Sequence, residues 1–470
     1  MLRPPHFLLC LCVPVLVLSG CSSSGHPAAG GDAGSRTDAG AADADAGDAS
    51  PPGAPTIPPI PPASCDGGMC IQHLVVIVQE NHTFDTHFGG YCTATPGSNP
   101  TCTSGPGCCE AMPATDPSGT APITLTDSVH ATFDPNHTAA CETIEIDDGK
   151  MDRFVTGDGG GANCATASNV ALADPAIVKP YWDLARESAL ADRYFQPVIG
   201  ESSSNDMFFA RATYLFADND FGPSGAIGTG CDVEPTPTQF MGPTIGDLLT
   251  AASVSWTWFA DGYAAMVAAA PGCPDKPLDC AFPFPFYPCA FEPGDDPFEF
   301  FASTVDHPNV IKDYAAFTSA LASGTLPAVS FIKAIGYKQE HPGFSSKLSP
   351  GVAFAAGVIA SVEESPYGGT TLVLLTYDEG GGYFDHVAPP PPNTFDNRPY
   401  GTRVPLLAVG PFAKRDFVSH VVMEHSSIVK FIEWNWLGQA TGQLGTRDTV
   451  VNNIGSLLDP TKTGTPVPEQ

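Results

Sequence analysis

The chain has 470 residues, 43% of them hydrophobic, so it is long enough for one large α/β domain with a sizeable core. Its 51 acidic residues outnumber its 20 basic ones, which gives a formal charge of −31. A field of this sign repels nucleic acid and anionic lipid, so the composition excludes general nucleic-acid binding. An anionic substrate therefore needs a local positive charge, such as a metal ion.

The first residues predict an export signal. An apolar stretch at 7–18 is too short to cross a bilayer as a mature helix. It ends in Leu18-Ser19-Gly20-Cys21, which resembles the bacterial lipobox, whose cysteine is acylated. We therefore expect residues 1–21 to be a lipoprotein signal peptide; a plain signal peptide cut nearby is the alternative. Ser22 follows the cysteine, so the lipid anchor is expected in the outer membrane if the source has two membranes.

A low-complexity segment follows at 22–64. It consists of Ala, Gly, Asp, Ser and Pro with almost no large apolar side chain. Such a segment cannot bury enough surface to offset the entropy of ordering it. We expect it to be a disordered tether that joins the anchor to a folded domain at 65–470.

Twelve cysteines follow the signal region: Cys65, Cys70, Cys92, Cys102, Cys108, Cys109, Cys141, Cys164, Cys231, Cys273, Cys280 and Cys289. An even number in an exported chain predicts up to six disulfides. A zinc–thiolate cluster is the competing interpretation, and it is disfavoured because no pair of Cys-x-x-Cys units is present.

Hydrophobic patterning predicts alternating strands and helices. Buried strands are expected at 73–79, 328–333, 370–377 and 404–409, and helices at 179–191, 207–214, 310–322, 352–364 and 425–437. Two Cys- and Pro-rich insertions, at 92–122 and 264–300, interrupt the pattern. The alternation predicts an α/β sandwich with a mostly parallel sheet, in which ligands bind beyond the carboxyl ends of the strands.

Acidic residues stand where two of these strands end. Glu80 and Asn81 follow the first strand, and Asp378 and Glu379 follow the strand at 370–377, just before three glycines. Carboxylate and amide oxygens suit a hard divalent cation. The alternative is that Glu80 caps a helix and the glycine run is a tight turn. Two such sites at equivalent strand ends favour a functional role.

A Gly-Ser turn and four histidines complete the candidates. The segment Gly200–Asn205 offers backbone N–H groups and a hydroxyl nucleophile, although an ordinary helix cap explains the same spacing. His130, His137, His341 and His386 lie in polar, Gly- or Pro-flanked settings, where histidine can act as an acid or a base.

Eight segments in order along residues 72–437 resemble the bacterial phosphoesterase family, which includes secreted phospholipases C and an acid phosphatase. The segments are His73–Gly89, Gly149–Val155, Asp192–Phe195, Gly200–Asn205, Gly324–Pro327, Glu340–Pro342, Tyr377–Val387 and Arg403–Pro405. The resemblance implies an alkaline-phosphatase-like α/β fold and hydrolysis of phosphate esters.

The resemblance also implies roles for single residues. Glu80, Asn81, Asp378 and Glu379 would hold one divalent metal ion, which Ser202 would also touch as the nucleophile. His130, His341 and His386 would contact the phosphoryl group or protonate the leaving oxygen. A phosphoserine intermediate follows from these roles.

Three departures from the family pattern affect substrate and register. Glu201-Ser202 stands where many relatives have Pro-Thr, which adds a negative charge and leaves Ser203 as an alternative nucleophile. Gly380 stands where a His or Asn is common.

Phosphodiester hydrolysis of the phospholipase C type is expected, with a phosphomonoesterase or a non-catalytic surface-binding lipoprotein as alternatives. The aromatic segment Phe282–Phe291 could shape a lipid or choline pocket, but disulfide-braced packing is favoured.

Overall fold

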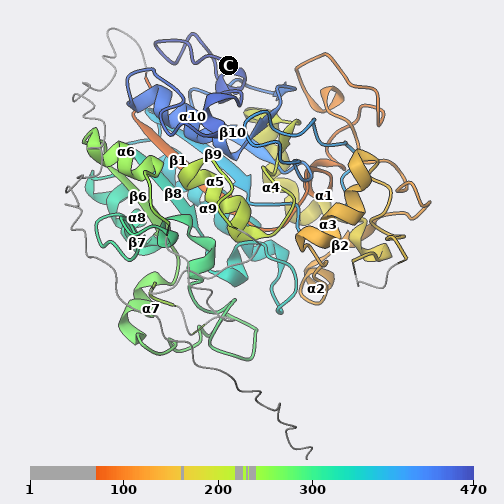
Figure 1. Ribbon diagram of the computed structural model, residues 1–470, viewed down its shortest axis with the longest axis horizontal. Helices are drawn as coiled ribbons and strands as arrows, with labels where there is room; N and C mark the ends of the chain where they lie inside the picture. Colours follow the sequence, from red (N-terminus) through yellow and green to blue (C-terminus); the bar gives the residue numbers. More distant parts are fainter. Residues whose placement is uncertain (1–69, 160–163, 217–225, 229–230, 232–239) are drawn as a thin grey trace, which may run out of the picture. The chain divides into compact units, whose positions relative to one another are not determined.

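The computed structural model describes residues 70–159, 164–216, 226–228, 231 and 240–470. Eight strands form one sheet in the order β11-β4-β10-β9-β1-β8-β6-β7 (Figure 1). These are β1 (His73–Gln79), β4 (Ala189–Ala191), β6 (Trp256–Ala260), β7 (Ile311–Asp313), β8 (Val329–Lys333), β9 (Thr371–Tyr377), β10 (Leu406–Val409) and β11 (Phe417–Ser419). Strand β10 is antiparallel to both its neighbours, and all other pairs are parallel. The predicted α/β class with a mostly parallel sheet is confirmed.

Ten α-helices, eight short 3-10 helices and two small sheets complete the secondary structure of the described part. The helices are α1 (Phe84–Phe88), α2 (Asp127–His130), α3 (Ala139–Ile146), α4 (Pro175–Glu187), α5 (Ser202–Arg211), α6 (Ile245–Ala251), α7 (Tyr263–Ala269), α8 (Tyr314–Ser323), α9 (Leu348–Glu364) and α10 (His425–Trp436). Strand β2 (Ile123–Leu125) pairs with β3 (Ala171–Ala173), and β5 (Tyr194–Phe195) pairs with β12 (Met423–Glu424).

The core lies on both faces of the large sheet. Alternate residues of β1 point to opposite faces, so Val76 belongs to one buried apolar cluster and Val75 to another. The first cluster is completed by α5, α6 and α10, and the second by α1, α4, α8 and α9. Helices therefore cover both faces, and this is why the central strands are continuous apolar runs.

Several helix boundaries differ from the sequence prediction. The helix expected at 310–322 begins at Tyr314, because Ile311–Asp313 forms strand β7, and the helix expected at 352–364 begins at Leu348. The helix expected at 179–191 begins earlier, because the Asp174 side chain accepts the Ala176 N–H at 2.9 Å and Pro175 occupies the first helical position. It ends at Glu187, because Ala189–Ala191 pair with β10 and β11 as strand β4. The helix expected at 207–214 begins at Ser202, which places the Gly-Ser turn directly at its N-terminus.

Disulfides pin the insertions, as predicted. The pairs are Cys92–Cys109, Cys102–Cys108, Cys141–Cys164, Cys231–Cys273 and Cys280–Cys289. The predicted signal peptide at 1–21 and tether at 22–64 lie outside the described residues, as does Cys65. Within the described residues, no helix is both long enough and apolar enough to span a membrane.

Candidate active site

Three parallel strands deliver polar residues to one edge of the sheet. In the strand register Gln79 of β1 pairs with Tyr377 of β9, and Val78 pairs with Lys333 of β8. The residues that follow β1 and β9 are therefore neighbours, and the Asn81 N–H donates to Asp378 Oδ1 at 3.0 Å. The predicted ligands Glu80, Asn81, Asp378 and Glu379 are all at most 1% exposed.

Ser202 faces two of these carboxylates from the N-terminus of α5. Its Oγ lies 3.1 Å from Glu80 Oε2 and 3.3 Å from Glu379 Oε1, so its hydrogen can be donated to either carboxylate. Asn205 fixes the preceding turn, since its Nδ2 donates to the Gly200 carbonyl at 2.7 Å. These contacts favour Ser202 over the more deeply buried Ser203 as the reactive hydroxyl.

The donor set fits a hard divalent cation. Asn81 Oδ1, Asp378 Oδ2 and Glu379 Oε2 are buried and accept no hydrogen bond within the described part of the chain. Burial and neighbouring carboxylates raise the pKa of Asp378 and of Glu379 well above the usual range. A bound cation would satisfy these oxygens and offset their charge. The carboxylates and the amide oxygen of this group could therefore hold the predicted metal ion.

The glycine run allows the two strand ends to approach each other. Gly381 has a φ of +61°, and a Cβ there would lie 2.5 Å from the Cβ of Asn81. Only glycine accommodates both the backbone conformation and this contact. Asn81 itself has a φ of 61°, a conformation that asparagine tolerates better than most residues.

Two histidines line the candidate site. His137 Nδ1 lies 2.8 Å from the Pro135 carbonyl, and its Nε2 lies 3.3 Å from Asn81 Nδ2. His137 Nε2 also lies 3.7 Å from Glu379 Oε1. The ring of His341 is 5.8 Å from that of His137, and its Nδ1 lies 2.7 Å from the Pro342 carbonyl. The structure thus brings the predicted His341 to the site, together with His137.

His137 was identified from the sequence only as one of four histidines in polar settings. Its position in the loop after α2 could not be inferred from spacing, because the loop brings it back towards β1 only in three dimensions. Burial by itself lowers the pKa of His137, but the charges of Asp134 and other carboxylates raise it overall. A protonated imidazole beside a phosphate ester would stabilise negative charge.

His130 is fully buried and makes its polar contacts with the backbone. Its Nδ1 lies 2.9 Å from the Ser346 carbonyl and its Nε2 lies 2.9 Å from the Glu340 carbonyl. Both ring nitrogens are therefore directed at the segment that carries His341. Through these contacts His130 holds that segment in place. A direct catalytic role for His130 stays a prediction.

A buried carboxylate lies immediately before His341. Glu340 is fully buried and accepts hydrogen bonds from Gln79 Nε2 (2.9 Å), His87 Nε2 (2.9 Å), Tyr181 OH (2.5 Å) and Tyr377 OH (2.9 Å). The donors come from β1, α1, α4 and β9. The Glu340 cluster therefore joins both strand ends of the site to the His341 segment.

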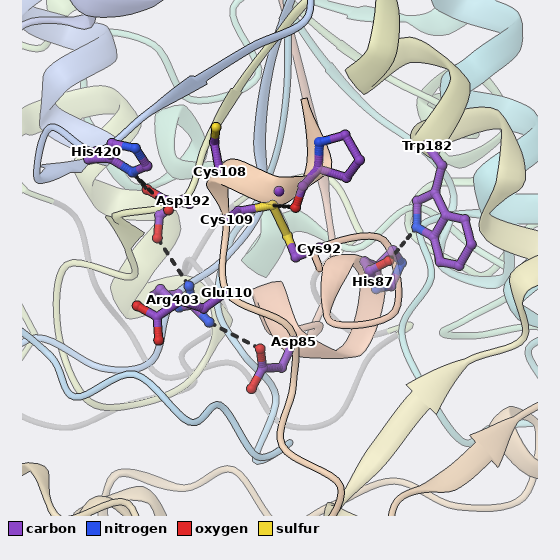
Figure 2. Close-up of a disulfide and its surroundings, with 12 residues drawn as sticks. Asp85, His87, Cys92, Cys108, Cys109, Glu110, Trp182, Asp192, Arg403 and His420 are labelled. Atoms are coloured by element: carbon purple, nitrogen blue, oxygen red, sulfur yellow. Dashed lines mark hydrogen bonds and ion pairs between the residues drawn. A yellow bond between two sulfur atoms is a disulfide. The ribbon is translucent and has the colours of Figure 1, made fainter. Parts of the chain in front are cut away.

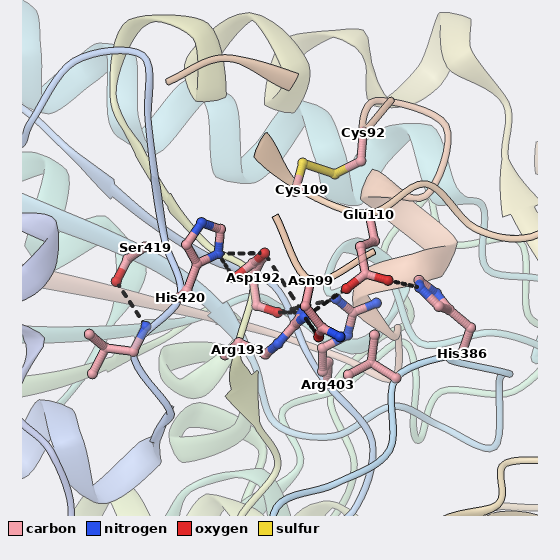
Figure 3. Close-up of polar contacts among 12 residues, drawn as sticks. Cys92, Asn99, Cys109, Glu110, Asp192, Arg193, His386, Arg403, Ser419 and His420 are labelled. Carbon is pink, nitrogen blue, oxygen red and sulfur yellow. Dashed lines mark hydrogen bonds and ion pairs between the residues drawn. A yellow bond between two sulfur atoms is a disulfide. The ribbon is translucent and has the colours of Figure 1, made fainter. Parts of the chain in front are cut away.

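His386 belongs to a different polar cluster. Figure 3 shows His386 beside Glu110, and Figure 2 shows Asp85 beside Arg403. Its Nδ1 lies 2.7 Å from Asp85 Oδ2, and its Nε2 lies 3.5 Å from Glu110 Oε2. Arg403 lies 3.0 Å from Asp85 Oδ1 and pairs with a second buried carboxylate, Asp385, at 2.9 Å. A cavity of about 410 Å³ is lined by His386, Glu110 and eight further residues. Within the described residues, no hydrogen bond or ion pair joins His386 to Ser202, so the role of His386 at phosphorus stays a prediction.

Lys333 and Asp206 were not predicted as site residues. Lys333 is 3% exposed and forms ion pairs with Glu80 and with Asp206, whose Oδ2 is 3.3 Å from Nζ. A charged lysine at the end of the apolar strand 328–333 is the sequence feature that could have indicated a site residue. The sequence does not show which carboxylates the fold places beside this lysine.

The aromatic insertion contacts the site through its rings. Tyr287 lies 5.6 Å from the ring of His341, and Phe344 contacts Tyr287, His341 and Phe282. Phe284 stacks on Phe286 at 5.2 Å and is 50% exposed. The favoured interpretation was packing alone. The rings do pack on one another, and they also border His341.

The chain is similar in sequence to phospholipases C of two bacteria. "Non-hemolytic phospholipase C" of Pseudomonas aeruginosa is 22% identical over 415 residues, and the match covers 77% of this chain and 53% of the relative. The chain thus spans about half the length of that relative. "Phospholipase C B" of Mycobacterium tuberculosis is 25% identical over 441 residues, covering 84% of this chain and 79% of the relative.

Among solved structures, a protein of the alkaline phosphatase superfamily from Vibrio parahaemolyticus matches 83% of this chain and 72% of that chain. Its sequence identity is 11% and the TM-score is 0.35, so this superposition is loose. Because the model of the Phosphoesterase family matches residues 71–437, the chain belongs to the Phosphoesterase family.

Proposed function

We propose that this protein is a metal-dependent hydrolase of phosphate esters that uses Ser202 as its nucleophile. The observation that carries the proposal is the placement of Ser202 Oγ within 3.3 Å of carboxylates from two strand ends. Membership of the Phosphoesterase family and similarity to phospholipases C support the reaction class.

The chemistry can be assigned to residues of this site. A divalent ion bound by Glu80, Asn81, Asp378 and Glu379 would favour ionisation of a nearby hydroxyl and offset phosphate charge. Ser202 Oγ attacks phosphorus and passes its proton to a neighbouring carboxylate, while the bond from phosphorus to the leaving oxygen breaks. The leaving oxygen takes a proton from His341 or His137. Water then attacks the phosphorus of the phosphoserine and gives a proton to the histidine that lost one. The bond from phosphorus to Ser202 Oγ breaks, and Oγ takes its proton back from the carboxylate as the phosphate product departs.

We further propose that the preferred substrate is a phosphodiester with an apolar or aromatic leaving group. Glu201 places a carboxylate next to Ser202, and its charge contributes to the raised pKa of Glu379. A diester carries one negative charge, whereas a monoester carries nearly two at neutral pH, so this carboxylate penalises the monoester more. The rings that border His341 offer apolar contact to the leaving group.

Hydrolysis of two chromogenic esters tests the proposal. The purified protein is expected to cleave p-nitrophenylphosphorylcholine faster than p-nitrophenyl phosphate, and a chelator should abolish both activities until divalent metal is restored. Ser202→Ala should reduce turnover by at least about a thousandfold. Ser203→Ala is the matched control and should retain most of the activity. Activity that survives Ser202→Ala, or that is insensitive to the chelator, would contradict the mechanism.

Export and lipid anchoring through Cys21 are a separate proposal that rests on the sequence alone. Metabolic labelling with a fatty acid should tag the wild-type protein and not Cys21→Ala. Labelling that persists in Cys21→Ala would contradict the lipobox assignment, and its outcome does not bear on the esterase mechanism.

A further inference from the structure

Lys333 lies beside two carboxylates of the candidate site. The lysine ends β8, is 3% exposed, and its ammonium pairs with Glu80 from β1 and Asp206 from α5. Glu80 therefore joins two groups, because its Oε1 faces Lys333 and its Oε2 lies 3.1 Å from Ser202 Oγ. The Glu80 carboxylate thus lies between the Lys333 ammonium and the Ser202 hydroxyl.

The carboxylates around Lys333 have the geometry of a cation site. Glu80, Asp206 and Asp295 each direct one oxygen into a group whose members all lie within 4.8 Å of one another. Asp206 Oδ1 is buried and accepts no hydrogen bond within the described residues. Three converging carboxylate oxygens are a donor set for a divalent ion, yet this position contains a lysine.

The space beside Lys333 is too small for a hydrated ion. A cavity of about 10 Å³ is lined by Lys333, Asp295, Asp296 and six further residues. That volume is at the lower limit for a single water molecule. With the lysine in place, a second divalent ion would have no room beside Lys333.

We propose that the Lys333 ammonium is a built-in second cation of the active site, held at the position that the Glu80–Asp206–Asp295 group would otherwise offer to a second divalent ion. The inference rests on the proposed metal-dependent function. The site then uses one exchangeable divalent ion on the side of Asn81, Asp378 and Glu379, and one fixed charge on the side of Asp206 and Asp295. Lys333 also orients Glu80 towards Ser202, so it acts as a positioning residue.

The contacts of the lysine agree with this role. Its ammonium is buried and pairs with Glu80 and Asp206, so these two carboxylates hold it at a fixed place in the site. An ammonium attached to the chain cannot leave the site, so it does not exchange with metal ions in solution.

Counting bound ions tests the inference independently of catalysis. The folded protein is dialysed to equilibrium against Mn²⁺ at about pH 8, and bound manganese is measured per chain by elemental analysis. Wild type is expected to bind one ion. Lys333→Ala opens the Glu80–Asp206–Asp295 group and should bind one ion more. Lys333→Arg keeps the charge and should bind one ion, and the double variant Lys333→Ala/Asp206→Asn should lose the additional ion.

The outcomes separate this inference from the proposed function. One ion in both wild type and Lys333→Ala, with equal affinity, would overturn the inference and leave the metal-dependent mechanism intact. No ion in wild type would overturn both. If Lys333→Ala does not fold, Asp206→Asn decides. It should still bind one ion with unchanged affinity, because Asp206 is a partner of the lysine, and loss of that ion would identify Asp206 as a metal ligand and refute the proposal.

Discussion

Glu145 is a buried carboxyl on α3, one helical turn after Glu142. It is fully buried, and its Oε1 accepts a hydrogen bond from Asn169 Nδ2 at 2.8 Å. Its Oε2 has no hydrogen-bond partner within the described residues. Burial, and then the charge of Glu142, raise the pKa of Glu145 to about 10. The folded protein therefore keeps this carboxyl protonated at neutral pH.

The raised pKa makes Glu145 a pH-dependent cost to stability. In the unfolded chain the carboxyl ionises with the usual pKa of 4.5, while the folded state retains the proton up to about pH 10. Stability is thus full below pH 4.5 and declines as the pH rises between these two values, by about 1.4 kcal/mol for each pH unit. At pH 7 the accumulated cost is roughly 3 kcal/mol. Glu145→Gln keeps the acceptor for Asn169 and removes the ionisation.

Urea unfolding followed by circular dichroism, at several values between about pH 4.5 and pH 8, tests this reasoning. Glu145→Gln should match wild type at the acidic end and exceed it by roughly 3 kcal/mol near pH 7. The exposed Glu364→Gln on α9 is the control and should show no pH-dependent gain. A gain that does not grow with pH, or a loss at every pH, would refute the assignment of a neutral Glu145.

Three further predictions concern the framework of the site. Glu340→Ala leaves four buried donors without their acceptor and should lower the free energy of unfolding by at least roughly 4 kcal/mol. Glu340→Gln should cause a smaller loss. Equal stability of Glu340→Ala and wild type in urea would contradict these hydrogen bonds. Arg403→Met leaves two buried carboxylates without their cation and should cost about 3–5 kcal/mol in the same assay, and a loss below about 1 kcal/mol would count against these ion pairs. Gly380→Ala would put a Cβ 2.0 Å from Thr402 Oγ1, so its thermal midpoint should fall, and Gly380→Ala/Thr402→Ala should recover part of the loss; an unchanged midpoint would argue against the contact.

The sequence was most informative where burial is continuous. Strand β1 occupies the predicted range 73–79, and β9 differs from its predicted range by one residue, because both are apolar runs buried on two faces. Glu80 and Asp378 could be placed together for the same reason, since parallel neighbours end at one edge. The direction of β10 could not be predicted, because an apolar run has the same pattern in either orientation.

Side-chain partners that come from different elements were harder to predict. His137 and His130 lie close together in the sequence, yet one ring reaches Asn81 and the other contacts backbone carbonyls. The proposed role of Lys333 depends on its contact with Asp206, which is 127 residues away in the chain. Spacing along the chain contains no information on such long-range pairs, whereas a strand or a helix cap is specified by residues within a few positions.

The charge distribution raises a question about encounter with an anionic substrate. A chain of formal charge −31 repels an anionic ester at long range, while the groups that would attract it, Lys333 and the cation site, are buried and act only at short range. Salt shortens the Debye length from about 30 Å to about 8 Å between 0.01 and 0.15 M and should therefore aid encounter. For the anionic diester bis(p-nitrophenyl) phosphate, kcat/KM should rise a few-fold over this range, at fixed metal concentration. The zwitterionic p-nitrophenylphosphorylcholine has no net charge and should change little. If kcat/KM rises equally for both diesters, salt acts on the protein itself and not on the encounter with the substrate. Long-range repulsion would then not limit access to Ser202.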